Sequence, residues 1–479
     1  MLLLHRQNWH MRSSQQQGLD HERRPLMKRW TSAALISCLL FAIAACGTPG
    51  SVTPPVAQAT AVPGTPQKIS WLVGASPEQL VQYQQVMSEA RRDLNIEVDI
   101  SPTTADNFNQ KVQTLIAAKE NPEFWVGGTD FVPWASRGAV KPINDYITTN
   151  NFDLSRFDPK TVDAFRWNGK LWRIPTATFT VVLFYNEDMF KAAGIDTPPT
   201  DWNNKTWTLD EFTQVAQKLT IDKNGKNALD PAFDPNNVVQ YGIADMQSFL
   251  LYPWYFGGDW SDKEGKTFTG NSPEVVKGLQ TVADLSNKYH VLPTPATIKA
   301  LGGDLFATGK AAMTMNGNWA IASYKEKPNL HWNVAASPIG TNHSIVLFTD
   351  GIGIGDNSKN PDAMWKVIDW IFGDETHTSE FIQAAGGGAA IPAMTSLQRT
   401  FISDAKESLP NLHIEVFTEA TKHPDAKPIY LRFNPNWSKI EIALNDGLEP
   451  LWSGKSDAAT LMNELQPKIQ KLMDEPVSN

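Results

Sequence analysis

Short apolar strands and amphipathic helices alternate at the start of the folded part of this chain. In order, the residue pattern predicts a strand over 68–74, a helix over 76–94, a strand over 95–100, a helix over 108–119 and a strand over 124–126. Ser76 can cap the first helix, and Pro77 is tolerated in its first turn. A β-α-β-α-β order predicts a parallel, doubly wound α/β sheet, which binds ligands beyond the carboxyl ends of its strands.

The alternation continues along the rest of the chain. Further strands are expected over 181–185, 311–315 and 344–348, and further helices over 186–194, 209–219, 273–289, 360–372 and 458–473. The glycine run Gly351–Gly355 lacks the GxGxxG spacing of a dinucleotide-binding turn, and its alternation predicts a strand. The 434 residues that follow residue 45 are too many for one typical core, so two lobes are expected.

Cys46 follows an apolar run that ends in small residues. Basic residues at 28–29 open the run, and residues 43–45 close it. Such a segment is typical of a secretory signal, and a cysteine directly after the cleavage site resembles a bacterial lipobox. We therefore expect residues 27–45 to be a lipoprotein signal peptide and Cys46 to carry the lipid. Residues 1–26 match no targeting segment and are expected to be a non-native upstream extension.

Two other interpretations of the apolar run remain open. One is a plain signal peptide with an incidental cysteine, and the other is an uncleaved membrane anchor, for which the run is short. The segment 46–66 is uncharged and rich in Gly, Pro, Thr and Ala, so it is expected to be a flexible tether. Because Cys38 lies inside the signal, cleavage leaves Cys46 as the only cysteine, and no disulfide can form within the mature chain.

The chain is acidic. Six of its 42 Lys and Arg residues and two of its 51 Asp and Glu residues precede Cys46, so the net charge of the remainder is −13. An acidic chain without a basic cluster argues against nucleic-acid binding and against a polybasic membrane contact. The 17 Trp residues indicate large cores, aromatic binding surfaces, or both.

Several local patterns then point in one direction. They are the lipobox with its tether, 122–126 leading to 138–143, 185–194 with Pro198-Pro199, 207–212, 309–313 with 316–319, and 453–455. In these residues, in this order, the chain from about residue 27 to its end resembles the extracellular solute-binding proteins of ABC importers. The resemblance is to the branch that binds sugars and oligosaccharides and includes maltose-binding-protein-like members.

The resemblance implies a two-lobe, type II-like periplasmic-binding-protein fold. Each lobe is a doubly wound α/β sheet flanked by helices, with the ligand cleft between the lobes. By this analogy lobe one is residues 67–184 with 347–392, and lobe two is residues 185–346 with 393–479. The chain is expected to cross near Leu183–Asn186, Ile345–Gly351 and Pro392. Lobe closure around a ligand is a hinge motion, and the membrane permease would recognise the closed state.

A sugar site needs aromatic platforms for the ring faces and a few fixed polar groups for the hydroxyls. By resemblance, the expected ligand-binding residues are Gly128, Thr129, Asp130, Thr178, Phe179, Trp254, Gly317, Asn318, Trp319, Gly387, Gly388, Arg432 and Trp437. The three glycines at 317, 387 and 388 would allow close backbone approach, and Trp319 would stack on a ring. The alternative for each tryptophan is a place in the core, and for Arg432 a carboxylate partner elsewhere.

The sequence departs from the common form of the family in two places. An insertion, 201–206, separates the Pro-Pro pair from the block at 207–212. The stretch 247–251 lacks the acid that many oligosaccharide binders carry there. Both departures leave the identity of the sugar open.

Motifs of common enzyme classes are missing from the sequence. It has no HExxH, paired CxxC, GxSxG or GxxxxGK[ST] motif. Residues 222–225 are similar to a calcium loop, but a lysine stands at a ligand position and the closing glutamate is missing, so a polar turn is expected. No cofactor, no metal and no catalysis are therefore expected.

Three functions remain open. The first is a monomeric binding protein that delivers a sugar or oligosaccharide to ABC permease subunits. It would stand on the outer face of the cytoplasmic membrane, extracellular or periplasmic, anchored by lipid on Cys46. The second is a lipid-anchored secreted carbohydrate-active enzyme, because the chain has carboxylates enough for a two-carboxylate glycosidase. The third is a sensory binding protein that docks on a receptor.

Overall fold

The computed structural model describes residues 64–120, 123–127, 131–386 and 389–477 of the chain. They belong to one compact unit that starts at Val62. The expected signal peptide, Cys46 and most of the expected tether lie outside the described residues. Among the described residues, no helix is both long enough and apolar enough to span a membrane.

The first of two main sheets contains the predicted start of the fold. Its strand order is β14-β7-β13-β3-β1-β2, with β4 beside β13. The strands are β1 (Gln67–Gly74), β2 (Ile96–Thr103), β3 (Phe124–Gly127), β4 (Val140–Lys141), β7 (Ile174–Phe179), β13 (Phe348–Gly355) and β14 (Ile391–Pro392). β1 pairs in parallel with β2 and β3, which confirms the predicted parallel start, whereas β13 is antiparallel to both β3 and β7.

The second sheet has the order β12-β8-β11-β10-β9. Its strands are β8 (Val181–Asn186), β9 (Ile221–Asp222), β10 (Val238–Ile243), β11 (Ala311–Gly317) and β12 (Trp332–Ala335). All six residues of β8 are buried, as expected for an apolar run between two partner strands. A small separate hairpin joins β5 (Arg166–Trp167) to β6 (Lys170–Leu171).

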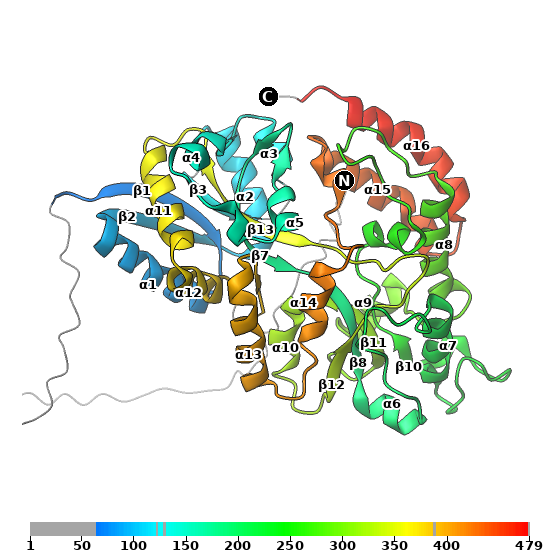
Figure 1. Cartoon of the computed structure of the whole chain (residues 1–479). Coiled ribbons are helices and arrows are strands. Elements are labelled where there is room, and N and C mark those ends of the chain that lie inside the picture. The colour runs from blue at the N-terminus through cyan, green and yellow to red at the C-terminus, as the bar shows by residue number, and fades with distance from the viewer. Residues whose placement is uncertain (1–63, 121–122, 128–130, 387–388, 478–479) are drawn as a thin grey trace, which may run out of the picture. The chain divides into compact units, whose positions relative to one another are not determined.

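Helices cover both sheets (Figure 1). Those before β8 are α1 (Pro77–Leu94), α2 (Ala105–Ala117), α3 (Val132–Ala135), α4 (Asn144–Thr149), η1 (Leu154–Arg156) and α5 (Pro159–Asp163). Between β8 and β13 come α6 (Glu187–Ala193), α7 (Leu209–Leu219), η2 (Pro235–Asn237), η3 (Phe249–Phe256), α8 (Pro273–Asn287), α9 (Pro295–Leu301), η4 (Asn318–Ala320) and α10 (Ile321–Tyr324). After β13 come α11 (Pro361–Gly373), α12 (Glu375–Gly386), η5 (Thr395–Leu397), α13 (Gln398–Ser408), α14 (Glu415–Lys422), η6 (Tyr430–Phe433), α15 (Trp437–Trp452) and α16 (Ala458–Asp474).

Local capping explains why several helices begin and end where the sequence predicts. The Ser76 side chain accepts the Gln79 N–H at 3.2 Å, and the Gln79 side chain accepts the Ser76 N–H at 2.9 Å. This reciprocal capping box satisfies two donors at the start of α1. At α6, Asn186 caps the Met189 N–H at 3.0 Å, and Gly194 ends the helix with a φ of 64°, a conformation that favours glycine.

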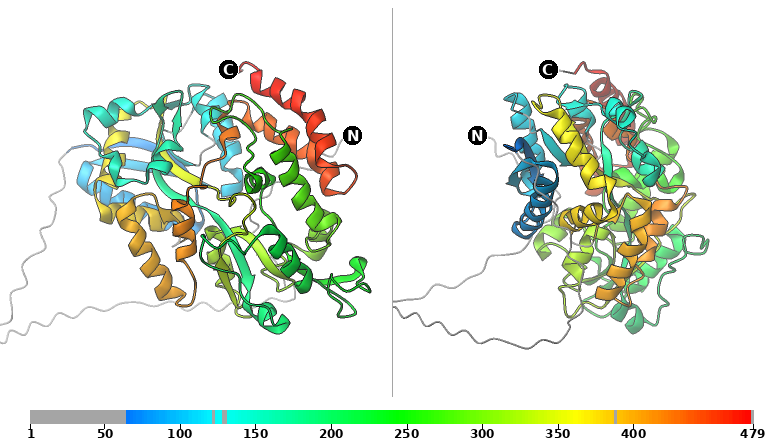
Figure 2. Two further views of the ribbon diagram at one scale, coloured as in Figure 1. Left: turned by 45° about the vertical axis from the view of Figure 1, so that its right-hand side comes forward. Right: turned by 60° about the vertical axis from the view of Figure 1, so that its left-hand side comes forward.

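The chain passes from the first sheet to the second at a single residue. Thr180 alone separates β7 from β8, so the passage lies before the expected stretch Leu183–Asn186. The left view of Figure 2 shows this continuous extended segment running between the two sheets. Residues Ser344–Leu347, expected to be part of a strand, form only an isolated bridge between Val346 and Lys427, and the strand begins at Phe348.

Aromatic side chains fill the cores on both sheets. Trp71 of β1 is fully buried, with its ring centre 4.7 Å from that of Tyr83 and 5.9 Å from that of Phe381. In the largest core, which lies on the second sheet, Trp254 and Trp260 are buried among helices η3, α8, α15 and α16. Much of the tryptophan content therefore serves packing.

The packing of β10 on α7 gives a first prediction. A Cβ added to Gly242 would lie 2.2 Å from the Ala216 carbonyl oxygen, so Gly242→Ala must push the strand away from the helix. Overpacking of this kind costs about 1–3 kcal/mol, and urea unfolding of the variant should show that loss. Gly373→Ala is the matched control, because nothing lies within 4 Å of a Cβ there. Equal midpoints for Gly242→Ala and wild type would contradict the close approach.

Candidate functional site

Four of the expected ligand-binding residues gather where the two sheets meet. Phe179 ends β7, and its register partner is Phe348 at the start of β13. The Trp319 ring centre lies 6.4 Å from that of Phe179 and 5.9 Å from that of Phe348. The Arg432 guanidinium carbon lies 5.5 Å from the ring centre of Phe348 and 5.6 Å from that of Trp437. We call these five residues the junction cluster; Phe348 is the member that sequence reasoning missed.

The junction cluster stands between two hydrophobic cores. Arg432 lies on helix η6, between two residues that point into different cores. Leu431 is buried in the core of the second sheet, and Phe433 is buried in the core of the first. Phe179, Trp319, Phe348 and Arg432 are each partly exposed, whereas Trp437 is only 4% exposed. Partly exposed rings beside a cation can meet both the apolar face and the polar edge of a ligand.

Gly317 serves Trp319 in this structure. A Cβ at position 317 would lie 2.1 Å from the Trp319 ring, so the ring folds back over its own preceding strand end. The tight turn of η4, which follows β11 directly, produces this geometry. The sequence analysis expected the glycine to admit a ligand, and the group that approaches it here is the tryptophan.

Asn318 is turned away from the exposed rings. It is fully buried, its Oδ1 accepts the Thr180 N–H at 2.9 Å, and its Nδ2 donates to the Ala389 carbonyl. Its backbone N–H also donates to the Thr180 carbonyl at 3.3 Å. The side chain therefore joins the passage between β7 and β8 to the segment that precedes β14. Thr178, 2% exposed, lies inside the first sheet between Thr349 and Ile391.

Trp254 is buried, unlike the partly exposed rings of the junction cluster. It is 2% exposed and belongs to the core of the second sheet. The Lys427 ammonium lies 4.7 Å from its ring centre and also pairs with Asp259 at 2.7 Å. In this structure the ring of Trp254 therefore packs in the core with the Lys427 ammonium group over its face.

The remaining expected residues, Gly128, Thr129, Asp130, Gly387 and Gly388, lie outside the described residues. The strand that leads into the first group ends at Gly127, where an added Cβ would lie 3.2 Å from Nη1 of Arg173. Arg173 is fully buried, and its guanidinium carbon lies 5.5–5.8 Å from the ring centres of Phe131, Trp134 and Phe165. A buried arginine beside this strand end was not foreseen from the sequence.

Polar groups collect at the carboxyl ends of β10 and β11. Gln247 Nε2 donates to Asn316 Oδ1 at 3.2 Å, Asn316 Nδ2 donates to the Tyr324 hydroxyl at 2.9 Å, and that hydroxyl donates to Asp304 at 2.8 Å. Asp245 accepts the Gln247 N–H at 3.1 Å. An acid therefore does stand here, two residues before the stretch 247–251 in which the sequence analysis looked for one.

Burial changes the chemistry of Asp245. Loss of solvation raises its pKa to about 7, and the nearby Asp304 charge adds to the rise, while backbone N–H groups of Gln247 and Met246 oppose it. The side chain can therefore stand as a neutral hydrogen-bond donor or as an acceptor near neutral pH.

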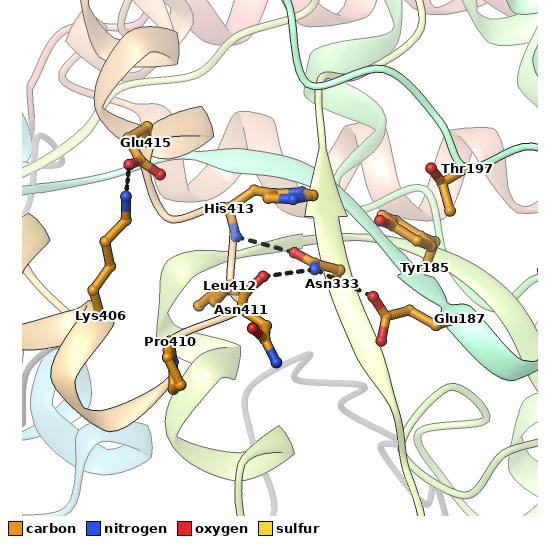
Figure 3. Close-up of a pocket in the computed structure, with 10 residues that line it drawn as sticks. All are labelled: Tyr185, Glu187, Thr197, Asn333, Lys406, Pro410, Asn411, Leu412, His413 and Glu415. Atoms are coloured by element: carbon orange, nitrogen blue, oxygen red, sulfur yellow. Dashed lines mark hydrogen bonds and ion pairs between the residues drawn. The ribbon is translucent and has the colours of Figure 1, made fainter.

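A separate cavity of about 620 Å³ opens at the other end of the second sheet (Figure 3). Tyr185 of β8 and Asn333 of β12 line it and are register partners; Tyr185 also pairs with Met313 of β11, four residues before Gly317. Polar groups of this cavity are paired with one another: Asn333 accepts the His413 N–H at 3.0 Å, and Lys406 pairs with Glu415. The His413–Asn333 bond fastens the 410–415 loop to β12, and the Lys406–Glu415 pair joins α13 to α14. We therefore place the candidate site at the junction cluster.

The predicted polar turn at 222–225 is confirmed. Asp222 Oδ1 accepts the N–H groups of Asn224 and Lys226 at 2.8 and 2.9 Å, and Lys226 pairs with Asp230 at 2.9 Å. Within the described part of the chain, no group of three or more His, Cys, Asp or Glu side chains is placed to hold a metal ion.

Asp245 gives a pH prediction. The ordinary pKa of 3.8 applies in the unfolded chain, so between about pH 4 and 7 the folded state holds a proton that the unfolded state releases. The contribution of Asp245 to stability therefore falls as the pH rises through this range. Between pH 5 and pH 8 the unfolding free energy of wild type should fall by about 2–3 kcal/mol more than that of Asp245→Asn. Urea unfolding at both pH values measures this, with exposed Asp404→Asn as control; parallel losses in Asp245→Asn and wild type would contradict it.

Comparisons with known proteins agree with this architecture. Residues 74–378 match the family model of bacterial extracellular solute-binding proteins. The maltotriose-binding protein of Pyrococcus abyssi (strain GE5 / Orsay) is 22% identical over 410 residues, covering 82% of this chain and 80% of that protein. The sn-glycerol-3-phosphate-binding periplasmic protein of Brucella abortus (strain 2308) is 22% identical over 417 residues, covering 83% and 90%.

A solved structure shows the same fold. An ABC substrate-binding protein from Listeria monocytogenes, in complex with cycloalternan, superposes with a TM-score of 0.71 at 23% identity, covering 86% of this chain and 100% of that one. The two sheets described above are thus the two lobes of a periplasmic-binding-protein fold. Because the family model spans most of the chain, the protein belongs to the bacterial extracellular solute-binding protein family.

Proposed function

We propose that this protein captures a sugar or oligosaccharide at the junction cluster by hinge closure of its two lobes and delivers it to an ABC permease. The observation that carries the proposal is the row of partly exposed aromatic rings, Phe179, Trp319 and Phe348, where the two sheets meet. Aromatic faces stack on sugar rings, and the Arg432 guanidinium beside these rings can donate to hydroxyls. The related proteins that bind maltotriose and cycloalternan support a saccharide ligand.

The proposed lobes follow the sheets. Lobe one comprises the elements of the first sheet, up to Thr180 and again from Phe348 to about Pro392, and lobe two the elements of the second. The protein acts as a monomer without a cofactor and returns its ligand unchanged. A hinge at these passages needs only a few kcal/mol between open and closed states for a ligand to shift the population.

A saccharide screen tests this function. Protein starting at Val62, the compact unit, is heated with mono-, di- and oligosaccharides, polyols and, as controls, amino acids and peptides. A ligand at 100 times its Kd adds about 2.7 kcal/mol to stability, and chromatography then checks that it is recovered intact. Stabilisation only by peptides or amino acids would overturn the sugar assignment, and new reducing ends would favour a hydrolase.

Trp319→Ala should weaken the best saccharide about 10- to 100-fold, since a stacking platform is lost. Calorimetric titration measures the change. Trp167→Ala is the matched control, because Trp167 is also partly exposed and packs against another ring, Trp172, away from the junction cluster. Equal affinities in Trp319→Ala and wild type would remove Trp319 from the site.

Anchoring at the outer face of the cytoplasmic membrane is part of the same proposal. The basic, apolar and small-residue pattern before Cys46 supports lipidation of its thiol. A lipid anchor would keep the binding protein at the membrane and so raise its effective concentration near the permease. In a bacterial host, Cys46→Ala should shift the protein from the detergent phase to the aqueous phase in a Triton X-114 partition. Retention of the variant in the detergent phase would favour an uncleaved apolar anchor.

A further inference from the structure

Arg432 differs from basic residues such as Lys427 in having no acid partner among the described residues. In the part of the chain that the structure describes, its side chain makes no ion pair, and its Nε is buried without a hydrogen-bond partner. The two acids near Tyr430, which shares helix η6 with Arg432, already have partners: Asp259 pairs with Lys427 at 2.7 Å, and Asp163 with Arg166 at 3.1 Å. In a chain with more acidic than basic residues, a half-buried arginine without an acid is unusual.

The guanidinium is also held in place. Its carbon lies over the rings of Phe348 and Trp437 at 5.5 and 5.6 Å, and aromatic faces stabilise a cation without neutralising it. Helix η6, which carries it, is fixed by the buried Asn434, whose Nδ2 donates to the Gly265 carbonyl at 2.9 Å. An arginine that is positioned in advance loses little entropy when it binds.

Planar guanidinium donors match the two oxygens of a carboxylate or phosphate. A neutral sugar can accept hydrogen bonds from Arg432 but cannot compensate its charge, whereas an acidic ligand does both. We propose that the ligand carries an anionic oxygen group, a carboxylate or a phosphate ester, that Arg432 binds beside the aromatic rings. This inference rests on the proposed saccharide-binding function and narrows its ligand class to acidic saccharides and sugar phosphates.

Matched pairs of neutral and acidic ligands test the inference. Calorimetric titration would compare maltose with maltobionate and galactose with galacturonate for the carboxylate, and glucose with glucose 6-phosphate for the phosphate. At least one acid should bind 10-fold or more tightly than its neutral partner. Its affinity should fall between 20 and 200 mM salt, because added ions screen the pair, and the pair that responds identifies the anionic group.

Variants separate charge from packing. Arg432→Gln should abolish the preference for the acid, and Arg432→Lys should retain part of it because the charge remains. Arg399→Gln, an exposed arginine on α13, should leave the preference unchanged. Unfolding midpoints report folding. Arg432→Gln loses its two cation–π contacts but no side-chain hydrogen bond among the described residues, so its midpoint should fall only slightly. If Arg432→Gln does not fold, the titration of Arg432→Lys tests the preference instead.

The outcomes distinguish this inference from the function on which it rests. Neutral saccharides that bind as tightly as their acids, in a manner that depends on Trp319, would overturn the inference and leave the saccharide-binding function standing. An acid preference that persists in Arg432→Gln would overturn the role of Arg432. Failure of every saccharide, neutral or acidic, to bind would overturn both.

Discussion

One buried amide fastens the passages on which the two-lobe arrangement depends. Asn318 holds the backbone of Thr180, where the chain leaves the first sheet, and the carbonyl of Ala389, just before it pairs as β14. Its neighbours in the chain are Gly317 and Trp319, and the ring of Trp319 lies against Gly317. A ligand that stacks on Trp319 would therefore contact the same short turn that ties the passages together. Ligand binding and lobe movement would then both involve this turn.

Three threonine hydroxyls at or beside the passages are unpaired within the described residues. The hydroxyls of Thr178, Thr180 and Thr349 are buried and have no hydrogen-bond partner within the described structure. A buried polar group left unpaired costs about 1–3 kcal/mol, a cost that fully paired strands do not carry. A movement that lets these hydroxyls reach water would recover part of that cost, while the Asn318 contacts hold the two passages together.

Sequence patterns predicted the features that depend on contacts between residues close together in the chain. They did not predict the features that depend on contacts between residues far apart in the chain. Ser76 and Gly194 mark helix ends through contacts within a few residues, so their effect can be read from the chain itself. Phe348 joins the site because β13 places it opposite Phe179, a pairing that no local signal reveals. The same reason explains Asn318 and Trp254: their residue types suit a ligand site, but distant partners bury them.

Two places are candidates for ligand binding: the cavity at Asn333 and the junction cluster. Whether their polar side chains already have partners distinguishes them better than the size of the cavity does. The cavity at Asn333 is roomy, yet the polar groups described above, Asn333 with the His413 N–H and Lys406 with Glu415, already have protein partners. A ligand there would have to break those contacts before making its own. At the junction cluster Arg432 has aromatic neighbours but no acid partner among the described residues, so a ligand adds an interaction without removing one of those described. Since binding free energy is what remains after such costs, the unpaired cation marks the more productive site.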